Sequence, residues 1–306
     1  MTEHKRETIY SQVTDRIIAE LEEGRLPWVQ PWGEAGTPTP LGMPRNASTG
    51  KAYSGINILL LWSAAIRDGR TRQDWLTFRQ AQALGGHVKK GERGSTVVFA
   101  DHFIPKAERE RAEREADAAV AVPFLKRYTV FNVEQCEGLP KGLAAAPAPR
   151  PEHAIVPRAE ALIAATGADF RIGGRLAYYM PSRDFIAVPP QVSFFHPIDY
   201  YRTCFHELGH WTGHQSRLER DIRTRFGTHA YAREELVAEM ASAFVCASLG
   251  IVPTVRHADY IGEWLELLRE DNRAIFRAAS QASKAADFLL AFEQAEADAD
   301  TAGAAA

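Results

Sequence analysis

The chain has 306 residues, of which 45% are hydrophobic and 25% charged, and its formal net charge is −3. The composition excludes a wholly disordered chain, the length favours two domains, and three cysteines without CxxC spacing exclude a disulfide framework. The longest apolar run is shorter than the roughly 20 residues that span a bilayer, and the N-terminus has no apolar signal segment, so we expect a soluble, cytoplasmic protein without a membrane partner.

The first half of the chain mixes helical and strand patterns. Apolar residues at helical spacing predict helices over residues 9–23, 56–67 and 77–84, and Thr77 is the expected N-cap of the third. Two segments rich in β-branched and aromatic residues predict strands, and they flank a charged stretch at residues 106–117. This stretch has no apolar stripe, so it is interpreted as a solvent-exposed helical insertion.

A linker is predicted at residues 141–153, where alanine and proline replace the periodic apolar residues. Beyond it the pattern predicts one helix, a short antiparallel sheet and several long helices, which include residues 197–211 and 232–249. The alanine-rich tail at residues 295–306 is expected to fray. Strands followed by helices are typical of α+β folds, so we predict a two-domain α+β protein.

The motif that carries chemistry is HELGH at residues 206–210, an HExxH sequence within the predicted helix 197–211. Residues four apart lie on one face of a helix, so the imidazoles of His206 and His210 can bind one metal ion. Glu207 then projects beside the metal, where a bound water would sit. Zinc is the metal that this pattern favours, and Mn²⁺ or another divalent transition metal is the alternative.

A catalytic zinc takes three protein ligands and keeps one position open. A third histidine at the metzincin spacing is excluded, because that position holds Ser216. The next helix offers Glu234, Glu235 and Glu239, and the last two share a face with apolar residues that should pack inward. We predict Glu235 as the ligand and Glu239 as the acceptor for a ligand histidine's other ring nitrogen, with Glu234 least favoured. The alternative is that all three acids lie on a solvated face.

Such a site would hydrolyse peptides. The metal lowers the pKa of its bound water towards about 7, and Glu207 takes the proton as the water attacks a carbonyl. The segment DFIAV at residues 184–188 precedes the metal helix and is expected to pair with an extended peptide by edge addition. The side chains considered for stabilising the oxyanion are Tyr200, Tyr201, His214 and Tyr231.

Residues 45–100 carry nine Lys or Arg against three acidic residues, which is enough positive charge to meet a polyanion. Aromatic residues are interleaved with these charges, and the combination binds single-stranded nucleic acid through phosphate contacts and base stacking. Trp62 and Phe99 are interpreted as core residues, and a solvated basic face is the alternative for the whole segment. The predicted nucleic-acid-binding residues are Arg45, Lys51, Tyr53, Trp75, Phe78, Arg79, Lys89, Lys90 and Arg93.

The two halves together resemble the ArdC-type antirestriction proteins of conjugative plasmids. In the first half, TGKAYSGINILLLW, WLTFRQAQALGGHVKKGERGSTVVF and RYTVFNVEQCEGLP look like the single-stranded-DNA-binding domain at the front of TraC-type primases. In the second, FHELGHWTGH and YAREELVAEMASAF look like a zincin-type metallopeptidase domain.

The resemblance implies a DNA-binding domain over residues 1–140 and a metallopeptidase domain over residues 154–294. It makes His206, His210 and Glu235 the metal site and Glu207 the catalytic carboxylate, in a protein that protects incoming DNA from restriction. Its partners would be single-stranded DNA and a peptide or protein such as a restriction-system component. Two alternatives stay open: a DNA-binding protein that shields DNA and holds a structural metal, and a regulatory peptidase without DNA contact.

Overall fold

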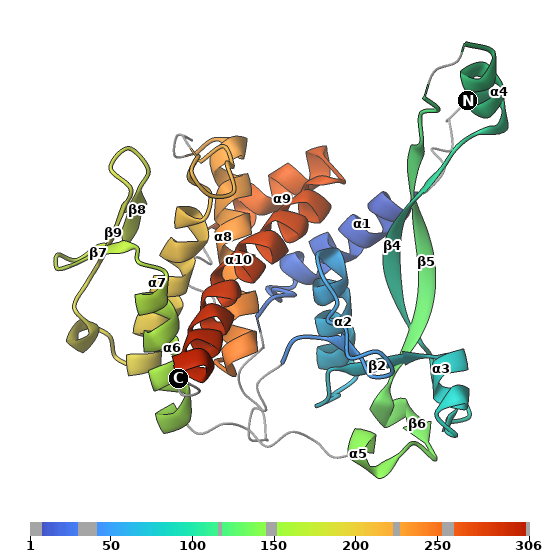
Figure 1. Ribbon diagram of the computed structural model, residues 1–306, viewed down its shortest axis with the longest axis horizontal. Helices are drawn as coiled ribbons and strands as arrows, with labels where there is room; N and C mark the ends of the chain where they lie inside the picture. Colours follow the sequence, from blue (N-terminus) through green and yellow to red (C-terminus); the bar gives the residue numbers. More distant parts are fainter. Residues whose placement is uncertain are drawn as a thin grey trace. The chain divides into compact units, whose positions relative to one another are not determined.

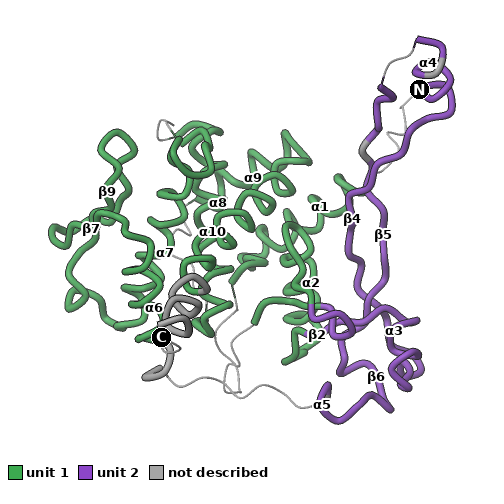
Figure 2. Tube along the Cα trace, viewed as in Figure 1, with its two compact units in different colours: residues 1–45, 51–73, 146–306 green, residues 46–50, 74–145 purple. Residues whose placement is uncertain are grey.

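The computed structural model describes residues 8–29, 42–115, 118–144, 152–222, 227–252 and 260–303, and its mixture of helices and strands is α+β, as predicted (Figure 1). Contacts divide the chain into a larger unit of residues 1–45, 51–73 and 146–306 and a smaller unit of residues 46–50 and 74–145 (Figure 2). This division departs from the predicted ranges 1–140 and 154–294. None of the helices in the described ranges has the length and hydrophobicity of a membrane span.

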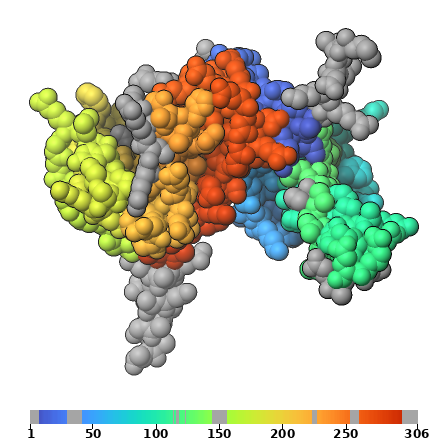
Figure 3. Space-filling model, turned by 90° about the horizontal axis from the view of Figure 1, so that it is seen from above, coloured from blue at the N-terminus to red at the C-terminus, as the bar shows by residue number. Residues whose placement is uncertain are grey.

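The larger unit is mainly helical. Helices α7 (Pro197–Trp211), α8 (His229–Leu249) and α10 (Ala274–Gly303) pack on one another. The space-filling view shows the orange residues of α8 beside the orange-red residues of the last two helices (Figure 3). Its helices are α1 (Ile9–Glu22), α2 (Ile56–Arg67), α6 (Glu152–Ala165), α7 (Pro197–Trp211), α8 (His229–Leu249), α9 (Ile261–Glu270) and α10 (Ala274–Gly303).

The first two helices of the chain belong to this larger unit and share its core. The hydroxyl of Thr14 in α1 donates to the carbonyl oxygen of Asn272 at 2.7 Å. The indole of Trp62 in α2 packs edge to face on Phe244 in α8, with ring centroids 5.5 Å apart. Trp62 is fully buried, so its interpretation as a core residue is confirmed. Helices from both ends of the sequence therefore form one hydrophobic core.

A three-stranded sheet of the larger unit precedes the metal helix in the sequence. It consists of β7 (Asp169–Ile172), β8 (Tyr178–Met180) and β9 (Phe185–Val188), in the order β7-β9-β8. Strand β9 is antiparallel to β8 but parallel to β7, so the prediction of an antiparallel sheet is wrong for one of the two pairs. Strand β9 lies between β7 and β8, the two strands that precede it in the sequence, and it runs in the same direction as β7.

The smaller unit is built on a long two-stranded ribbon. Strands β4 (Ser95–Phe103) and β5 (Val122–Asn132) pair antiparallel along their length, and α4 (Lys106–Glu115) lies at their far end (Figure 1). Strand β2 (Asp74–Thr77) pairs with the other end of β5. The hydroxyl of Thr77 accepts from the backbone N–H of Gln80, which makes it the N-cap of α3 as predicted. The remaining elements include α3 (Phe78–Ala83), β3 (His87–Val88), β6 (Cys136–Glu137) and α5 (Lys141–Ala144). The short strand β1 (Arg45–Asn46) is divided between the units, with Arg45 in the larger and Asn46 in the smaller.

Two segments expected to be irregular are partly helical. Helix α5 occupies the start of the predicted linker 141–153, α6 begins at Glu152, and residues 145–151 lie outside the described ranges. Helix α10 continues to Gly303, although residues 295–306 were expected to fray, and residues 304–306 are outside the description. Alanine is the commonest residue of this tail, and it has the highest helix propensity.

Candidate functional site

The HExxH helix forms as the sequence predicts. Helix α7 begins with Pro197 at its first position and has Asp199 in its first turn, and both suit the amino end of a helix. Helix α8 is capped by Thr228, whose hydroxyl accepts from the N–H of Tyr231, and it ends at Gly250 with φ of 84°. The two helices that supply the candidate ligands therefore have well-defined ends.

A glycine in the motif lets α7 and α8 approach closely. A Cβ atom added at Gly209 would lie 3.1 Å from the Cα and 3.3 Å from the carbonyl oxygen of Ala238 in α8. Backbone atoms cannot turn aside as a flexible side chain would. The close approach brings the acids of α8 to the two histidines of α7.

A Gly209→Val variant is expected to lose about 1–3 kcal/mol of stability, because the new side chain meets the backbone of α8. Urea or thermal unfolding measures this loss. Gly262→Val in α9 is the matched control: no atom of the described residues lies within 4 Å of its Cβ position, so its effect should stay within about 0.5 kcal/mol. Equal losses from the two variants would contradict tight packing of the two helices at Gly209.

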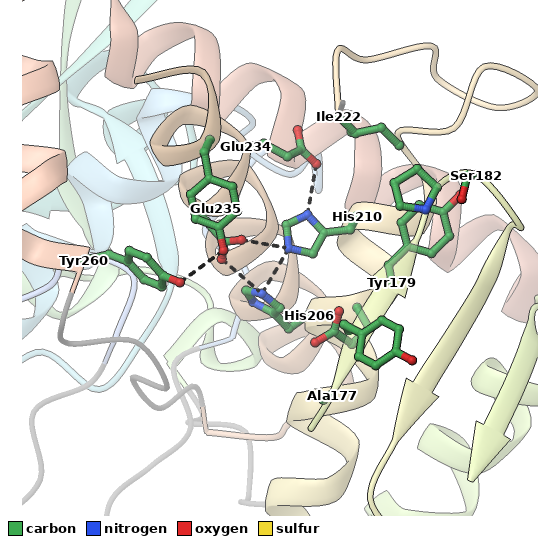
Figure 4. A pocket seen from close by; sticks show the side chains of 13 residues that line it. Ala177, Tyr179, Ser182, His206, His210, Ile222, Glu234, Glu235 and Tyr260 are labelled. Atoms are coloured by element: carbon green, nitrogen blue, oxygen red, sulfur yellow. Dashed lines mark hydrogen bonds and ion pairs between the residues drawn. The ribbon is translucent and has the colours of Figure 1, made fainter. Parts of the chain in front are cut away.

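The structure brings three predicted ligands together. The Nε2 atoms of His206 and His210 are 3.2 Å apart, and each lies 3.5 Å from a carboxylate oxygen of Glu235. Figure 4 shows the three side chains pointing toward one another, two from α7 and one from α8. Among the described residues these three form the group of His, Cys and acidic side chains that could hold a metal ion.

These separations fit a tetrahedral ion. Bonds of about 2.0–2.1 Å in tetrahedral geometry place neighbouring ligand atoms about 3.3 Å apart. The observed separations between the ligand atoms of His206, His210 and Glu235 are 3.2–3.5 Å. Two imidazoles and one carboxylate are also a donor set that zinc and related divalent ions accept.

A cleft of about 880 Å³ opens over the candidate ligands and is lined by Glu207 and by residues of β8 (Figure 4). A second hollow of about 460 Å³ is also lined by Glu207 and Ala177. Glu207 thus lines both hollows. Of the four side chains considered for the oxyanion, Tyr231 lines the larger cleft, and the structure adds Tyr260.

The strand beside this cleft differs from the predicted one. The segment 184–188 contains β9, which is hydrogen-bonded on both sides, so the prediction that it adds an extended peptide is wrong. Among the described strands, β7 and β8 are the two edges of this sheet, and Tyr178 and Tyr179 of β8 line the cleft. The sheet edge beside the cleft is therefore β8.

Charges around the ligands are strongly coupled. Burial by itself would raise the pKa of Glu235, but the hydrogen bond from His206 and the charge of His210 outweigh it and lower that pKa to about 2. Burial likewise opposes the charged form of His210, yet its bond to Glu234 and the charge of Glu235 raise its pKa to about 9. Burial and the bond to Tyr260 raise the pKa of Tyr231 far above its ordinary value, so its hydroxyl stays protonated.

Glu234, the acid least favoured from the sequence, supports His210. Its carboxylate lies 3.2 Å from Nδ1 of His210, so a proton on Nδ1 directs the Nε2 lone pair to the ligand cluster. The guanidinium of Arg220 donates to both oxygens of Glu234 and to the carbonyl oxygen of Gly209. Glu239 lies 3.6 Å from Nδ1 of His206, on the side away from the cluster.

Arg220 lies in the connection after α7, where the sequence offered no signal for a role at the site. Its guanidinium holds the carboxylate of Glu234 against the helix that carries the ligand histidines. Outer hydrogen-bond partners of this kind set the orientation and basicity of metal ligands. The pair of Arg220 and Glu234 is therefore part of the candidate metal centre.

The predicted nucleic-acid-binding residues are divided between the two units. The larger unit holds the exposed Arg45 and Lys51 and the half-buried Tyr53. The smaller unit holds Trp75 and the exposed side chains of Phe78, Arg79, Lys89, Lys90 and Arg93.

The solvent exposure of two aromatic side chains is the reverse of what the sequence predicts. Trp75 is 1% exposed in β2, so the prediction that its ring is available for base stacking is wrong. Phe99 was interpreted as a core residue, yet 61% of it is exposed on β4. A strand alternates its side chains between two faces, and the tertiary packing decides which face is covered.

Comparison with known proteins identifies both parts of the chain. A model of the N-terminal domain of anti-restriction factor ArdC matches residues 7–131, and a model of a zincin-like metallopeptidase matches residues 157–281. The protein thus combines an ArdC N-terminal domain with a zincin-like domain. Crystal structures of the antirestriction ArdC protein from the R388 plasmid, metal-free and Mn(II)-bound, give TM-scores of 0.78 and 0.75 at 41% identity, covering 93% of this chain and 97% of that one. The chain belongs to the ArdC family of antirestriction proteins.

Two further relatives extend this picture. The uncharacterized protein y4eC of Sinorhizobium fredii is 42% identical over 289 residues, which is 92% of each chain. DNA primase TraC of Escherichia coli is 40% identical over 304 residues, which cover 94% of this chain but 28% of the primase. The likeness to that primase is therefore confined to about a quarter of its length.

Proposed function

We propose that this protein binds single-stranded DNA and protects incoming plasmid DNA from restriction, and that its zincin-like domain is a metal-dependent peptidase. The observation that carries the peptidase is the convergence of His206, His210 and Glu235 within 4.8 Å of one another, in a cleft lined by Glu207. Membership of the ArdC family and the likeness to DNA primase TraC support the DNA-binding half.

In the proposed reaction, a bound Zn²⁺ or Mn²⁺ would polarise a water molecule and the peptide carbonyl. Glu207, which is buried in the cleft wall, accepts the proton of the attacking water and passes it to the leaving amine. The free edge of β8 holds the peptide in extended form by backbone hydrogen bonds. The protonated hydroxyl of Tyr231 donates to the oxygen that becomes negative.

For the DNA-binding half, the exposed basic residues of the smaller unit would contact phosphates. Lys89, Lys90 and Arg93 lie in the turn before β4, and the ammonium of Lys89 also donates to the carbonyl oxygen of Glu134 at 3.0 Å. Each phosphate contact in a single strand contributes about 0.7 to the slope of log affinity against log salt.

A transfer assay into restricting cells, with DNA binding measured on the same variants, separates the two halves of the proposal. Lys89→Glu with Lys90→Glu should abolish protection and weaken binding to single-stranded DNA, because two phosphate contacts become repulsive. Lys106→Glu with Arg109→Glu in α4 makes the same change of charge elsewhere in the unit and should leave both unchanged. Weak salt dependence of binding, or unchanged binding by the first variant, would contradict phosphate contact.

Glu207→Gln tests the role of the peptidase. This variant should keep its metal and its DNA affinity and lose at least about 100-fold in metal-dependent peptide hydrolysis. If protection is lost as well, peptide hydrolysis is part of antirestriction. Full protection by Glu207→Gln would show that shielding of DNA is sufficient, and unchanged hydrolysis would remove Glu207 from the mechanism.

A further inference from the structure

The ribbon of β4 and β5 exposes four aromatic rings. The exposed fractions are 61% for Phe99, 50% for Phe103, 37% for Phe124 and 40% for Tyr128. Large aromatic side chains are normally among the most buried, and clustered exposure of apolar surface marks a site of interaction. We call these four residues the aromatic row.

The register of the ribbon places the aromatic row on one face. Tyr128 lies opposite Val97, Phe99 opposite Lys126, Phe124 opposite Asp101, and Phe103 opposite Val122. Directly opposed residues of antiparallel strands share a face, and so do residues two apart on one strand. Four successive levels of this face therefore carry one ring each, alternately from β5 and from β4.

The spacing of these levels matches the spacing of nucleotides in an extended single strand of nucleic acid. The ring centroids of Phe103 and Phe124 lie 5.6 Å apart, edge to face. Two residues of a strand advance about 6.8 Å, so successive levels of the face stand about 6.8 Å apart along the ribbon. This is about twice the 3.4 Å that separates nucleotides along one strand of a duplex. A single strand extended to that degree meets one ring per nucleotide, and bases of any sequence stack on aromatic rings.

The charges on and near this face favour a polyanion. Lys126 belongs to the same face, and its ammonium lies 5.4 Å from the ring centroid of Tyr128. Asp101 is the acidic residue among the paired positions of the face, and its carboxylate accepts from the backbone N–H of His102 at 2.8 Å. Residues 87–103 and 122–132 together carry five basic and two acidic side chains.

Helix α4, at the far end of the ribbon, is less suited to bind a polyanion. Its ten residues carry four basic and four acidic side chains, so their charges cancel. Arg111 is held by Glu108 and Glu115 within the helix, at 2.7 Å each. A negatively charged strand is therefore attracted to the face of the ribbon and to the basic turn before β4.

We propose that single-stranded DNA runs along this face, with its bases stacked on the aromatic row and its phosphates near Lys126 and the basic turn at residues 89–93. The inference rests on the proposed DNA-binding function and names the surface that performs it. It replaces Trp75 with Phe99, Phe103, Phe124 and Tyr128 as stacking residues.

The test is fluorescence anisotropy of the full-length protein with a labelled oligothymidylate of about 16 nucleotides. Phe99→Leu and Phe124→Leu keep an apolar side chain but remove the flat ring. Each should weaken binding about 5- to 150-fold and leave the salt dependence unchanged. Phe99→Trp keeps a ring and should retain wild-type affinity, which excludes a folding defect as the cause. Phe195→Leu, at a fully exposed phenylalanine of the larger unit, is the matched control and should have no effect.

The outcomes separate this inference from the function on which it rests. Normal binding by the wild type, Phe99→Trp and Phe195→Leu, with weak binding by the two ring variants, supports the aromatic row. Wild-type affinity in Phe99→Leu and Phe124→Leu overturns it, and DNA binding by the protein then stands. Absence of binding by the wild type overturns the DNA-binding function itself. Ring variants that bind DNA normally but no longer retain a protein partner would make the row a protein-docking surface and overturn the inference.

Discussion

A His206→Ala variant is expected to purify without a stoichiometric divalent metal. It removes one of three ligand atoms that lie 3.2–3.5 Å from one another, and two remaining protein ligands hold a divalent ion weakly. The loss of affinity should exceed the roughly 10- to 100-fold that removal of an outer hydrogen-bond partner costs. Elemental analysis of protein dialysed against Zn²⁺ or Mn²⁺, with titration of the apoprotein, measures it.

The chain offers a close control for this experiment. His214 lies one turn beyond His210, but its Nδ1 faces the hydroxyl of Ser216 at 2.8 Å and does not belong to the ligand group. His214→Ala should therefore retain the metal of the wild type. Equal metal content in His206→Ala and the wild type would remove the metal centre, and with it the proposed peptidase.

An Arg220→Ala variant is expected to lose about 3–5 kcal/mol of stability, because it removes one partner of a buried ion pair and leaves the carboxylate of Glu234 to His210 alone. Arg220 and Glu234 are both almost fully buried, and the guanidinium also donates to the hydroxyl of Thr212 and to the carbonyl oxygen of Gly209. All of these bonds are lost together. Urea unfolding of the metal-free protein measures the change without a contribution from the ion.

A solvent-exposed ion pair of the larger unit provides the control. Arg269 pairs with Glu22, and the two side chains are 54% and 48% exposed. Arg269→Ala should change stability by no more than about 1 kcal/mol, because water screens such a pair. A loss in Arg220→Ala as small as that in Arg269→Ala would show that the contact with Glu234 does not stabilise the fold.

Local patterns were sufficient for the helix that carries the two histidines, whereas the helix predicted at 232–249 begins earlier in the structure, at His229. The ends of the helix 197–211 and of the helix 56–67 agree with α7 and α2, because apolar periodicity and end signals act within a few residues. The same local geometry puts His206 and His210 on one face of α7. The strands were harder, since their pairing partners and their edges depend on chain segments far away in the sequence.

The sequence by itself determined an α+β protein, the helix with its two histidines, the family resemblance and a basic segment with aromatic residues. Only the tertiary structure decided which acid of α8 faces the histidines and that Glu234 joins Arg220. It also decided that α1 and α2 share a core with the C-terminal helices and that Phe99 is exposed where Trp75 is buried. Periodicity fixes which side chains share a face, whereas the crossing of distant helices and strands fixes what that face meets.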